Sequence, residues 1–210
     1  MKKMWQTLGI FTSVCAISEI IFQIYRYRLK RSSVRKKTNK TEVLFFPDKK
    51  VACINYFTSE CENESCSFSH EENSLSKLFQ FIHNAVKSVD VCVFVFTCTD
   101  LADLLIQAVG RGVSVRVITD CEQVDIPGSQ IWRLRSQGIA VRTDNSSFYM
   151  HHKFVIIDNT RLLNGSFNWT RQAVTGNQEN LLVTSDSQLV CLYKERFAKL
   201  WRQYKTKKDQ

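Results

Sequence analysis

The sequence predicts an α/β protein whose core is a mixed β-sheet flanked by helices on both faces. Residues 89–96 (VDVCVFVF) form an almost continuous β-branched and aromatic run, typical of a strand that is buried on both faces. A helical pattern at 100–109 and a second strand pattern at 113–119 follow, and this order predicts a parallel pair with a right-handed crossover. Two further strands, 151–158 and 161–164, are close enough in sequence to form an antiparallel hairpin, which makes the predicted sheet mixed.

The remaining elements follow from periodicity and from residues that begin or end helices. Further helices are predicted at 74–88, 129–137 and 187–204, and further strands at 139–142 and 179–184. Asn73 or Ser74 is the expected cap of the first of these helices, and Gly138 stops the second. The last helix is amphipathic, and we expect its apolar stripe to pack on the core. That stripe consists of Leu189, Tyr193, Phe197, Leu200, Trp201 and Tyr204.

Length and charge limit what the chain can be. At 210 residues it holds one α/β domain and a short appendage, so two folded enzymatic domains are excluded. The net charge is +9, and residues 1–50 carry all of it, with 12 Lys and Arg against three acidic residues. The rest of the chain is balanced at 17 against 17. Any nucleic-acid site on the body is therefore a local patch, not a wholly basic surface.

The N-terminus reads as a membrane anchor. Residues 5–25 are mostly apolar and reach about 32 Å as a helix, against a hydrocarbon core of about 30 Å. Glu19 opposes insertion at a cost of about 2.5 kcal/mol or more, which the apolar side chains offset by a small margin. Eight basic residues and no acidic one lie between residues 26 and 40, and this bias places the body in the cytosol. A cleaved signal peptide with a basic tail is the alternative.

Three of the eight cysteines lie close together in the sequence. The spread of the others, two of them in or beside a buried-looking strand, favours a reducing compartment over a secreted disulfide scaffold. Cys53, Cys61, Cys66 and His70 supply three thiolates and an imidazole, the ligands of a tetrahedral structural zinc site. The spacing resembles a CCCH zinc finger with the first two gaps each one residue short. A loop of reduced cysteines without metal is the alternative.

A hairpin is expected to gather the reactive side chains. Strand alternation puts His151 and Lys153 on one face and His152 on the other. If Asn159 and Thr160 form a two-residue turn, partners across the hairpin have numbers summing to 319. Lys153 is then opposite Ser166, and His151 is opposite Asn168.

These residue types suit attack on a phosphodiester without a catalytic metal. A neutral His151 imidazole is the expected nucleophile, and Lys153 and Asn168 are expected to bind the non-bridging oxygens. Glu179, at the start of the next strand, is expected to hold the other imidazole nitrogen. Asp158 has the opposite parity to His151, so we expect it to brace the turn or the lysine.

The pattern His-x-Lys-x4-Asp-x6-Gly-Ser-x-Asn occupies His151, Lys153, Asp158, Gly165, Ser166 and Asn168. It resembles the signature of the phospholipase D superfamily, which implies the phospholipase D fold and a phosphohistidine intermediate released with help from a second such histidine. The pattern occurs once, and neither His70 nor His83 has a lysine two residues further on. The resemblance therefore implies a homodimer in which both His151 side chains share one cleft.

The anchor, the cysteine cluster and the single motif together resemble the mitochondrial phospholipase D, or Zucchini, family. This resemblance implies a single-pass protein of the outer mitochondrial membrane that faces the cytosol. It also implies two candidate activities, cleavage of single-stranded RNA in the production of PIWI-interacting RNAs and hydrolysis of cardiolipin in an anionic phospholipid membrane to phosphatidic acid. The cysteine cluster and the basic arm favour RNA, and a catalytically silent RNA-binding or membrane scaffold is a third reading. The predicted organisation is a flank at 1–4, an anchor at 5–25, a basic juxtamembrane linker at 26–50, a CCCH segment at 51–72, a catalytic domain at 73–205 and a tail at 206–210.

Overall fold

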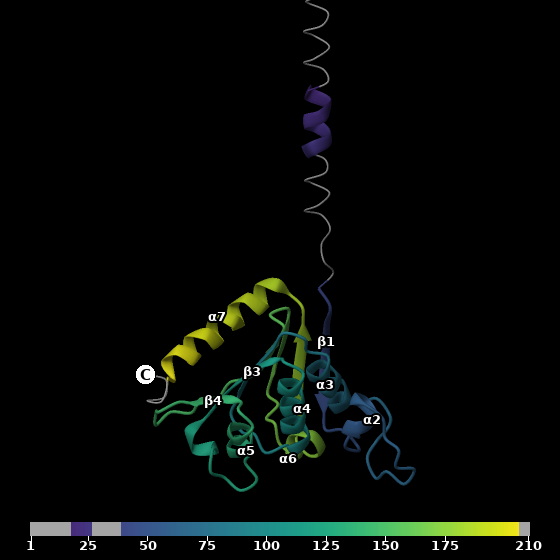
Figure 1. Ribbon diagram of the computed structural model, residues 1–210, viewed down its shortest axis with the longest axis vertical. Coiled ribbons are helices and arrows are strands. Elements are labelled where there is room, and N and C mark those ends of the chain that lie inside the picture. Colours follow the sequence, from purple (N-terminus) through teal and green to yellow (C-terminus); the bar gives the residue numbers. More distant parts are fainter. Residues whose placement is uncertain (1–17, 27–38, 206–210) are drawn as a thin grey trace, which may run out of the picture. The chain divides into compact units, whose positions relative to one another are not determined.

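The computed structural model describes residues 18–26 and 39–205 (Figure 1). The chain divides into two units, Met1–Asn39 and Lys40–Gln210. In the first unit, residues 18–26 form a helix. No helix in the described part of the chain is both long enough and apolar enough to span a bilayer. Most of the predicted anchor at 5–25 lies outside the described residues, so it stays a prediction.

The second unit is built on one seven-stranded mixed sheet, which confirms the predicted architecture. Its strands are β1 (Thr41–Phe46), β2 (Ser88–Val93), β3 (Ser114–Thr119), β4 (Ala140–Thr143), β5 (Lys153–Ile157), β6 (Arg161–Gly165) and β7 (Glu179–Thr184). They lie in the order β1-β7-β6-β5-β2-β3-β4. The strands β2 and β3 are parallel, as the β-α-β pattern predicted. The strand β4 is parallel to β3, and the other neighbours are antiparallel.

Helices cover both faces of this sheet. They are α2 (Ile54–Thr58), α3 (Ser74–His83), α4 (Thr99–Gly110), α5 (Ile131–Ser136), α6 (Arg171–Thr175) and α7 (Ser187–Gln203). The larger core joins α3 and α4 to one face, where Leu78 and Leu105 lie with Val91 and Leu163. The smaller core joins α7 to the opposite face. It contains Val190, Phe197 and Leu200 of the helix with Phe154, Ile156 and Leu162 of the sheet.

Some predicted boundaries are wrong, for local reasons. The helix α3 ends at His83 and not at residue 88, because β2 begins at Ser88 and the intervening chain turns. In α7, Val190 is buried in place of the predicted Leu189, which is 39% exposed. The predicted linker at 26–50 contains β1, which pairs along the whole of β7. We therefore propose that the catalytic domain begins near residue 40 and includes this strand.

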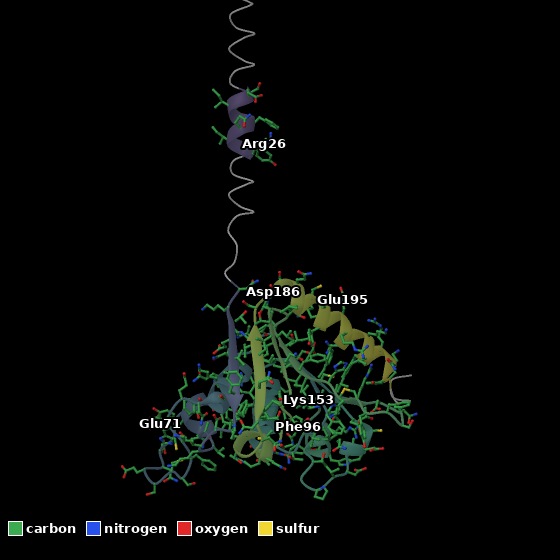
Figure 2. All side chains as sticks on the ribbon, turned by 180° about the vertical axis from the view of Figure 1, so that it is seen from behind. Arg26, Glu71, Phe96, Lys153, Asp186 and Glu195 are labelled. Atoms are coloured by element: carbon green, nitrogen blue, oxygen red, sulfur yellow. The ribbon has the colours of Figure 1, made fainter. Side chains whose placement is uncertain are left out.

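Strand directions bring several loops to one end of the sheet. The parallel strands β2 and β3 end there, β5 and β7 begin there, and β6 ends there. Lys153, labelled in Figure 2, lies towards this end, whereas Asp186, just beyond the far end of β7, lies at the opposite end. Every predicted catalytic residue except Asp158 is in a segment that reaches the first of these ends.

Candidate active site

His151 and Lys153 lie together at the start of β5. The Lys153 Nζ donates a hydrogen bond to the His151 carbonyl oxygen at 3.0 Å. The ring of Phe94, just beyond the end of β2, is 4.7 Å from the His151 ring and 5.3 Å from the Lys153 Nζ. Phe94 therefore contacts both the predicted nucleophile His151 and Lys153, and sequence reasoning missed these contacts because it placed Phe94 inside the strand.

The His151 imidazole is suited to attack. Burial of the ring lowers its pKa below the usual histidine value, and the nearby Lys153 ammonium lowers the pKa further, whereas Asp120 acts in the opposite direction. A lowered pKa keeps the imidazole neutral at neutral pH, and only the neutral form has a nucleophilic nitrogen. The residue is still exposed, so a substrate can reach it.

Burial also lowers the pKa of Lys153, and Glu179 opposes that shift. Glu179 is thus close enough to act on the lysine, but it does not hold His151 as predicted. Its carboxylate accepts hydrogen bonds from the Ser166 hydroxyl and from the Asn177 amide, the latter at 3.0 Å. Within the described residues, the His151 ring nitrogens have no hydrogen-bond partner of their own. The predicted Glu179–His151 bond is therefore absent, and Glu179 orders Ser166 instead.

Asn168 follows β6 and lies beside the end of β2. Its side-chain oxygen accepts a hydrogen bond from the Val95 backbone N–H at 3.4 Å, next to the Phe94 that contacts His151. This bond leaves the amide –NH2 group as a donor at the same end of the sheet. The structure therefore brings His151, Lys153, Ser166, Asn168 and Glu179 to the same end of the sheet.

The hairpin that carries the motif has a register different from the predicted one. Ile157 pairs with Arg161 and Phe154 with Asn164, so the partner numbers sum to 318 rather than 319. The loop between the paired residues Ile157 and Arg161 has three residues, Asp158, Asn159 and Thr160, and not the predicted two. The φ values of Asp158 and Asn159 are 52° and 56°. Asp and Asn tolerate this left-handed conformation, whereas a β-branched threonine does not, so Asp158 and Asn159 take the left-handed positions and Thr160 is the additional loop residue. The predicted Lys153–Ser166 and His151–Asn168 pairs are accordingly wrong.

Asp158 lies at the other end of β5, away from the reactive group. Its carboxylate accepts backbone hydrogen bonds from Val86, Lys87 and Ser88, the shortest at 2.6 Å. These bonds lower the pKa of Asp158 although burial acts to raise it. The residue fastens the β5–β6 turn to the loop before β2. Asp158 therefore braces the turn, as expected, and it does not contact His151.

Replacing Asp158 by Ala is expected to lower the free energy of unfolding by about 2 to 3 kcal/mol, because three backbone N–H groups lose a charged acceptor. Since the folded-state pKa is depressed, the stabilisation is present above the unfolded pKa of about 3.9 and is lost as pH falls through the folded value. Urea denaturation at pH 7 and below pH 4 measures this. Glu122→Ala removes an exposed carboxylate elsewhere in the chain and serves as control. An unchanged midpoint at pH 7 contradicts the bracing role.

Gly165 is required where β6 approaches β7. A Cβ atom there would lie 1.9 Å from the Asn180 carbonyl oxygen, which belongs to the backbone. The same approach lets the Ser166 N–H reach that carbonyl at 3.1 Å and places the Ser166 hydroxyl beside Glu179.

Replacing Gly165 by Ala is expected to destabilise the fold by about 3 kcal/mol and to displace Ser166, because backbone cannot move aside as a side chain can. Thermal melting and turnover measure the two effects. Gly110→Ala is the matched control, since nothing lies within 4 Å of the added Cβ. Equal melting temperatures for the two variants contradict the close approach.

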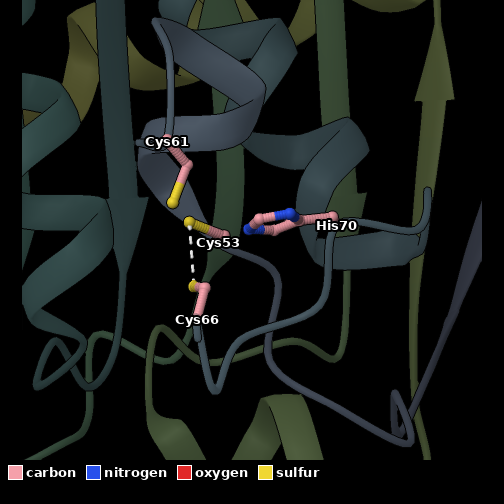
Figure 3. Close-up of side chains that lie close together, drawn as sticks. All are labelled: Cys53, Cys61, Cys66 and His70. Carbon is pink, nitrogen blue, oxygen red and sulfur yellow. Dashed lines mark hydrogen bonds between the residues drawn. The ribbon is translucent and has the colours of Figure 1, made fainter. Parts of the chain in front are cut away.

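The four predicted metal ligands meet in one cluster, shown in Figure 3. The ligand atoms of Cys53, Cys61, Cys66 and His70 all lie within 4.8 Å of one another. The Cys53 and Cys66 sulfur atoms are 3.7 Å apart, close to the roughly 3.8 Å expected between two thiolates bound tetrahedrally at about 2.3 Å from zinc. His70 directs its ring at the sulfurs, and its buried Nε2 has no hydrogen-bond partner among the described residues. This group fits a structural metal, and it leaves no position for substrate.

Comparisons with known proteins agree with this geometry. The family model described as "Cardiolipin synthase, PLD-like domain" matches residues 78–201. The chain is 39% identical to the mitochondrial cardiolipin hydrolase of Xenopus tropicalis over 201 residues, covering 96% of this chain and 92% of that protein. It is 45% identical to the mitochondrial cardiolipin hydrolase of Chlamydomonas reinhardtii over 170 residues, covering 80% and 76%.

A solved structure shows the same fold. Nuc from Salmonella typhimurium, a phospholipase D family member, superposes with a TM-score of 0.64 at 25% identity. The superposition covers 80% of this chain and 97% of Nuc. The chain therefore belongs to the phospholipase D superfamily, as its motif predicted, and is a hydrolase that acts on phosphodiester bonds.

Proposed function

We propose that the chain is an endoribonuclease that cleaves single-stranded RNA through a phosphohistidine on His151. The observation that carries the proposal is that a neutral His151 imidazole lies with Lys153 and Asn168 at one accessible end of the sheet. The chain places a nucleophile and donors for non-bridging oxygens there, which is what phosphoryl transfer requires.

The first step forms a P–N bond from His151 to phosphorus and breaks the P–O bond to the leaving group. A second imidazole, in its protonated form, gives its proton to the departing oxygen. Water then attacks phosphorus, passes a proton to that second imidazole, and releases His151 neutral. In each cycle the second imidazole loses one proton and regains one, so the two histidines titrate as a coupled pair.

We propose that the second imidazole is His151 of another copy of the chain. His70 is in the cysteine cluster, and His83 is at the end of α3, where no lysine accompanies it. His152 accepts a hydrogen bond from Arg196 and faces α7. The single motif therefore needs a two-fold homodimer to supply both imidazoles.

RNA is favoured over lipid by the surroundings of His151. The exposed aromatic side chains of Phe148 and Tyr149, 82% and 62% accessible, stand just before it and can stack on bases. The adjoining pocket has two histidines, an arginine and two tyrosines in its lining beside Met150 and Leu200, so more of its residues are polar than aliphatic. Cardiolipin hydrolysis is the second candidate, and the names of the relatives favour it.

The deciding experiment gives the full-length protein, in phosphatidylcholine vesicles, single-stranded RNA and cardiolipin-containing vesicles in parallel. Cleavage of RNA that disappears in His151→Ala supports the proposal. Release of phosphatidic acid without RNA cleavage overturns it in favour of the lipid. Binding of RNA without turnover of either substrate indicates that the protein is a catalytically silent RNA-binding or membrane scaffold.

Zinc is the ion that we propose for the cysteine cluster, in a structural role. Replacing Cys66 by Ser is expected to lower bound zinc from about one equivalent to well below half and to lower the melting temperature. Metal analysis and thermal melting measure this, and Cys191→Ser, on the exposed face of α7, is the control. Chelators are expected to spare the chemical step in folded protein. Full zinc content in the Cys66 variant contradicts the assignment.

We further propose the outer mitochondrial membrane as the location, with residues 5–25 as the anchor and the body in the cytosol. The names of the relatives and the basic segment at 26–40 support this. Protease treatment of intact mitochondria is expected to digest the body, and its protection contradicts this orientation.

A further inference from the structure

The pocket that adjoins the reactive residues lies on the side that faces α7. It has a volume of roughly 330 Å³ and is lined by Tyr149, Met150, His151, His152, Arg196, Leu200 and Tyr204. His151 is therefore shared between the catalytic edge and this pocket. The proposed reaction uses His151 and leaves the functions of His152, Arg196 and Tyr204 unassigned.

Arg196 brings an unneutralised positive charge to this pocket. Its Nε donates a hydrogen bond to the His152 Nε2 at 3.2 Å, which orients the guanidinium towards the segment that carries His151. No carboxylate of the described residues forms an ion pair with Arg196, and its two terminal nitrogens have no hydrogen-bond partner there. Burial of the ring lowers the pKa of His152, and the charge of Arg196 lowers it further. The His152 imidazole therefore stays neutral, and Arg196 is the cation of this pair that can bind an anion.

Two tyrosine hydroxyl groups add further donors to the pocket. The hydroxyl groups of Tyr149 and Tyr204 have no hydrogen-bond acceptor among the described residues. Two carboxylates that act on Tyr204, those of Asp120 and Asp144, are buried outside the lining and accept backbone N–H groups instead. Two unpaired hydroxyl groups near one arginine fit an anion with several acceptor oxygens, which describes a phosphate group.

The position of the pocket identifies which phosphate this is. His151 and His152 are consecutive, so their Cα atoms are about 3.8 Å apart, and the arginine is held by the second of them. A phosphodiester attacked by His151 and a neighbouring phosphodiester of the same molecule can therefore be bound side by side. We propose that Arg196, oriented by His152 and assisted by Tyr204, binds the phosphodiester next to the one that is cleaved.

This inference rests on the proposed phosphodiesterase function and specifies its substrate class, namely molecules with two phosphodiesters joined by a short linker. Consecutive phosphates of RNA have this arrangement, and so do the two phosphates of cardiolipin, which a glycerol joins. Arg196 is thus a specificity residue, and it takes no part in bond making or breaking.

The test compares matched substrates with one and two phosphodiesters, using the full-length protein in vesicles. In the RNA arm they are the dinucleotide UpU and the trinucleotide UpUpU, and in the lipid arm phosphatidylglycerol and cardiolipin. The readout is the ratio of kcat/KM for the two-phosphate substrate to that for the one-phosphate substrate. Arg196→Gln is expected to lower this ratio about 10- to 100-fold, because a hydrogen-bonded charge on phosphate is lost.

Two further variants separate the subsite from a general effect of substitution. Arg202→Gln removes an exposed arginine from the same helix, outside the pocket, and is expected to leave the ratio unchanged. Arg196→Lys keeps the charge but not the planar fork and is expected to retain part of the ratio. Melting temperatures identify any variant that fails to fold.

The outcomes are distinguishable from failure of the proposed function. If His151→Ala abolishes turnover of all substrates and Arg196→Gln lowers only the ratio, both proposals stand. The substrate pair whose ratio falls, RNA or lipid, then shows which kind of molecule supplies the second phosphate. An equal loss for one- and two-phosphate substrates, or an unchanged ratio, overturns the subsite. Turnover that persists in His151→Ala instead overturns the catalytic assignment.

Discussion

Replacing His151 by Ala is expected to lower turnover of phosphodiester substrates by at least about 10⁴-fold, because removal of a covalent nucleophile abolishes the step that every later step requires. The side chain is exposed and its ring nitrogens have no hydrogen-bond partner in the described part of the chain. Its ring contact with Phe94 is the main packing that alanine removes. The variant is therefore expected to fold and to melt close to the unchanged protein.

Measurement of kcat/KM with RNA and with cardiolipin, next to circular dichroism and thermal melting, separates loss of chemistry from loss of fold. His83→Ala is the matched control, since it removes a partly buried histidine at the end of α3, away from the reactive edge. The control is expected to keep its turnover. Residual activity of more than a few per cent in His151→Ala assigns the nucleophile to another residue.

Sequence patterns were sufficient to predict an element where its apolar residues recur with the period of a strand or a helix. The strand predicted at 179–184 and the helix predicted from residue 187 both begin where the structure has them, because the strand contains an apolar run and the helix a repeated apolar stripe. Within the motif, alternation selected His151 and Lys153 as a pair, and these two residues do lie together.

Features that depend on pairing between distant segments were not predictable in this way. The strand β1 is an edge strand whose Val43 and Phe45 are exposed, so its local pattern resembles a linker until β7 pairs with it. The hairpin register depended on whether the loop had two residues or three, and the one additional residue changed every partner. Local sequence does not show that Glu179 meets Ser166, because that contact arises from the close approach of Gly165 to β7.

Two charged residues near the site, Asp120 and Arg196, were also not predicted from the sequence. Asp120 follows β3 at the edge where the other reactive residues gather, and a polar residue after a parallel strand was the signal available for it. Arg196 is one of several charged residues on an amphipathic helix. Its place beside His152 follows from the packing of α7 on Phe154, which only the folded chain shows.

Mixing unchanged protein with His151→Ala protein is expected to lower activity more steeply than dilution does. A shared site needs one neutral and one protonated His151 imidazole, so a mixed dimer has either no nucleophile or no acid. If subunits exchange freely at equal amounts, about one quarter of the dimers contain two intact chains, and activity falls to about one quarter of the undiluted value. Independent sites on separate chains leave about one half.

The chains are best combined by co-expression with two different affinity tags, because mixed dimers can then be isolated directly and slow exchange does not matter. Isolated mixed dimers are expected to be nearly inactive, whereas mixed dimers of unchanged and Arg202→Gln chains are expected to retain full activity. Half activity in the first case contradicts the shared site and returns the search for the second acid to a single chain. There, His152 is the imidazole nearest in sequence, but its Nε2 already accepts a hydrogen bond from Arg196 and its pKa is lowered by burial and by that same charge. A neutral imidazole is a much weaker acid than an imidazolium and is not the group that protonates a leaving oxygen, so the dimer is the arrangement that the charges of this chain favour.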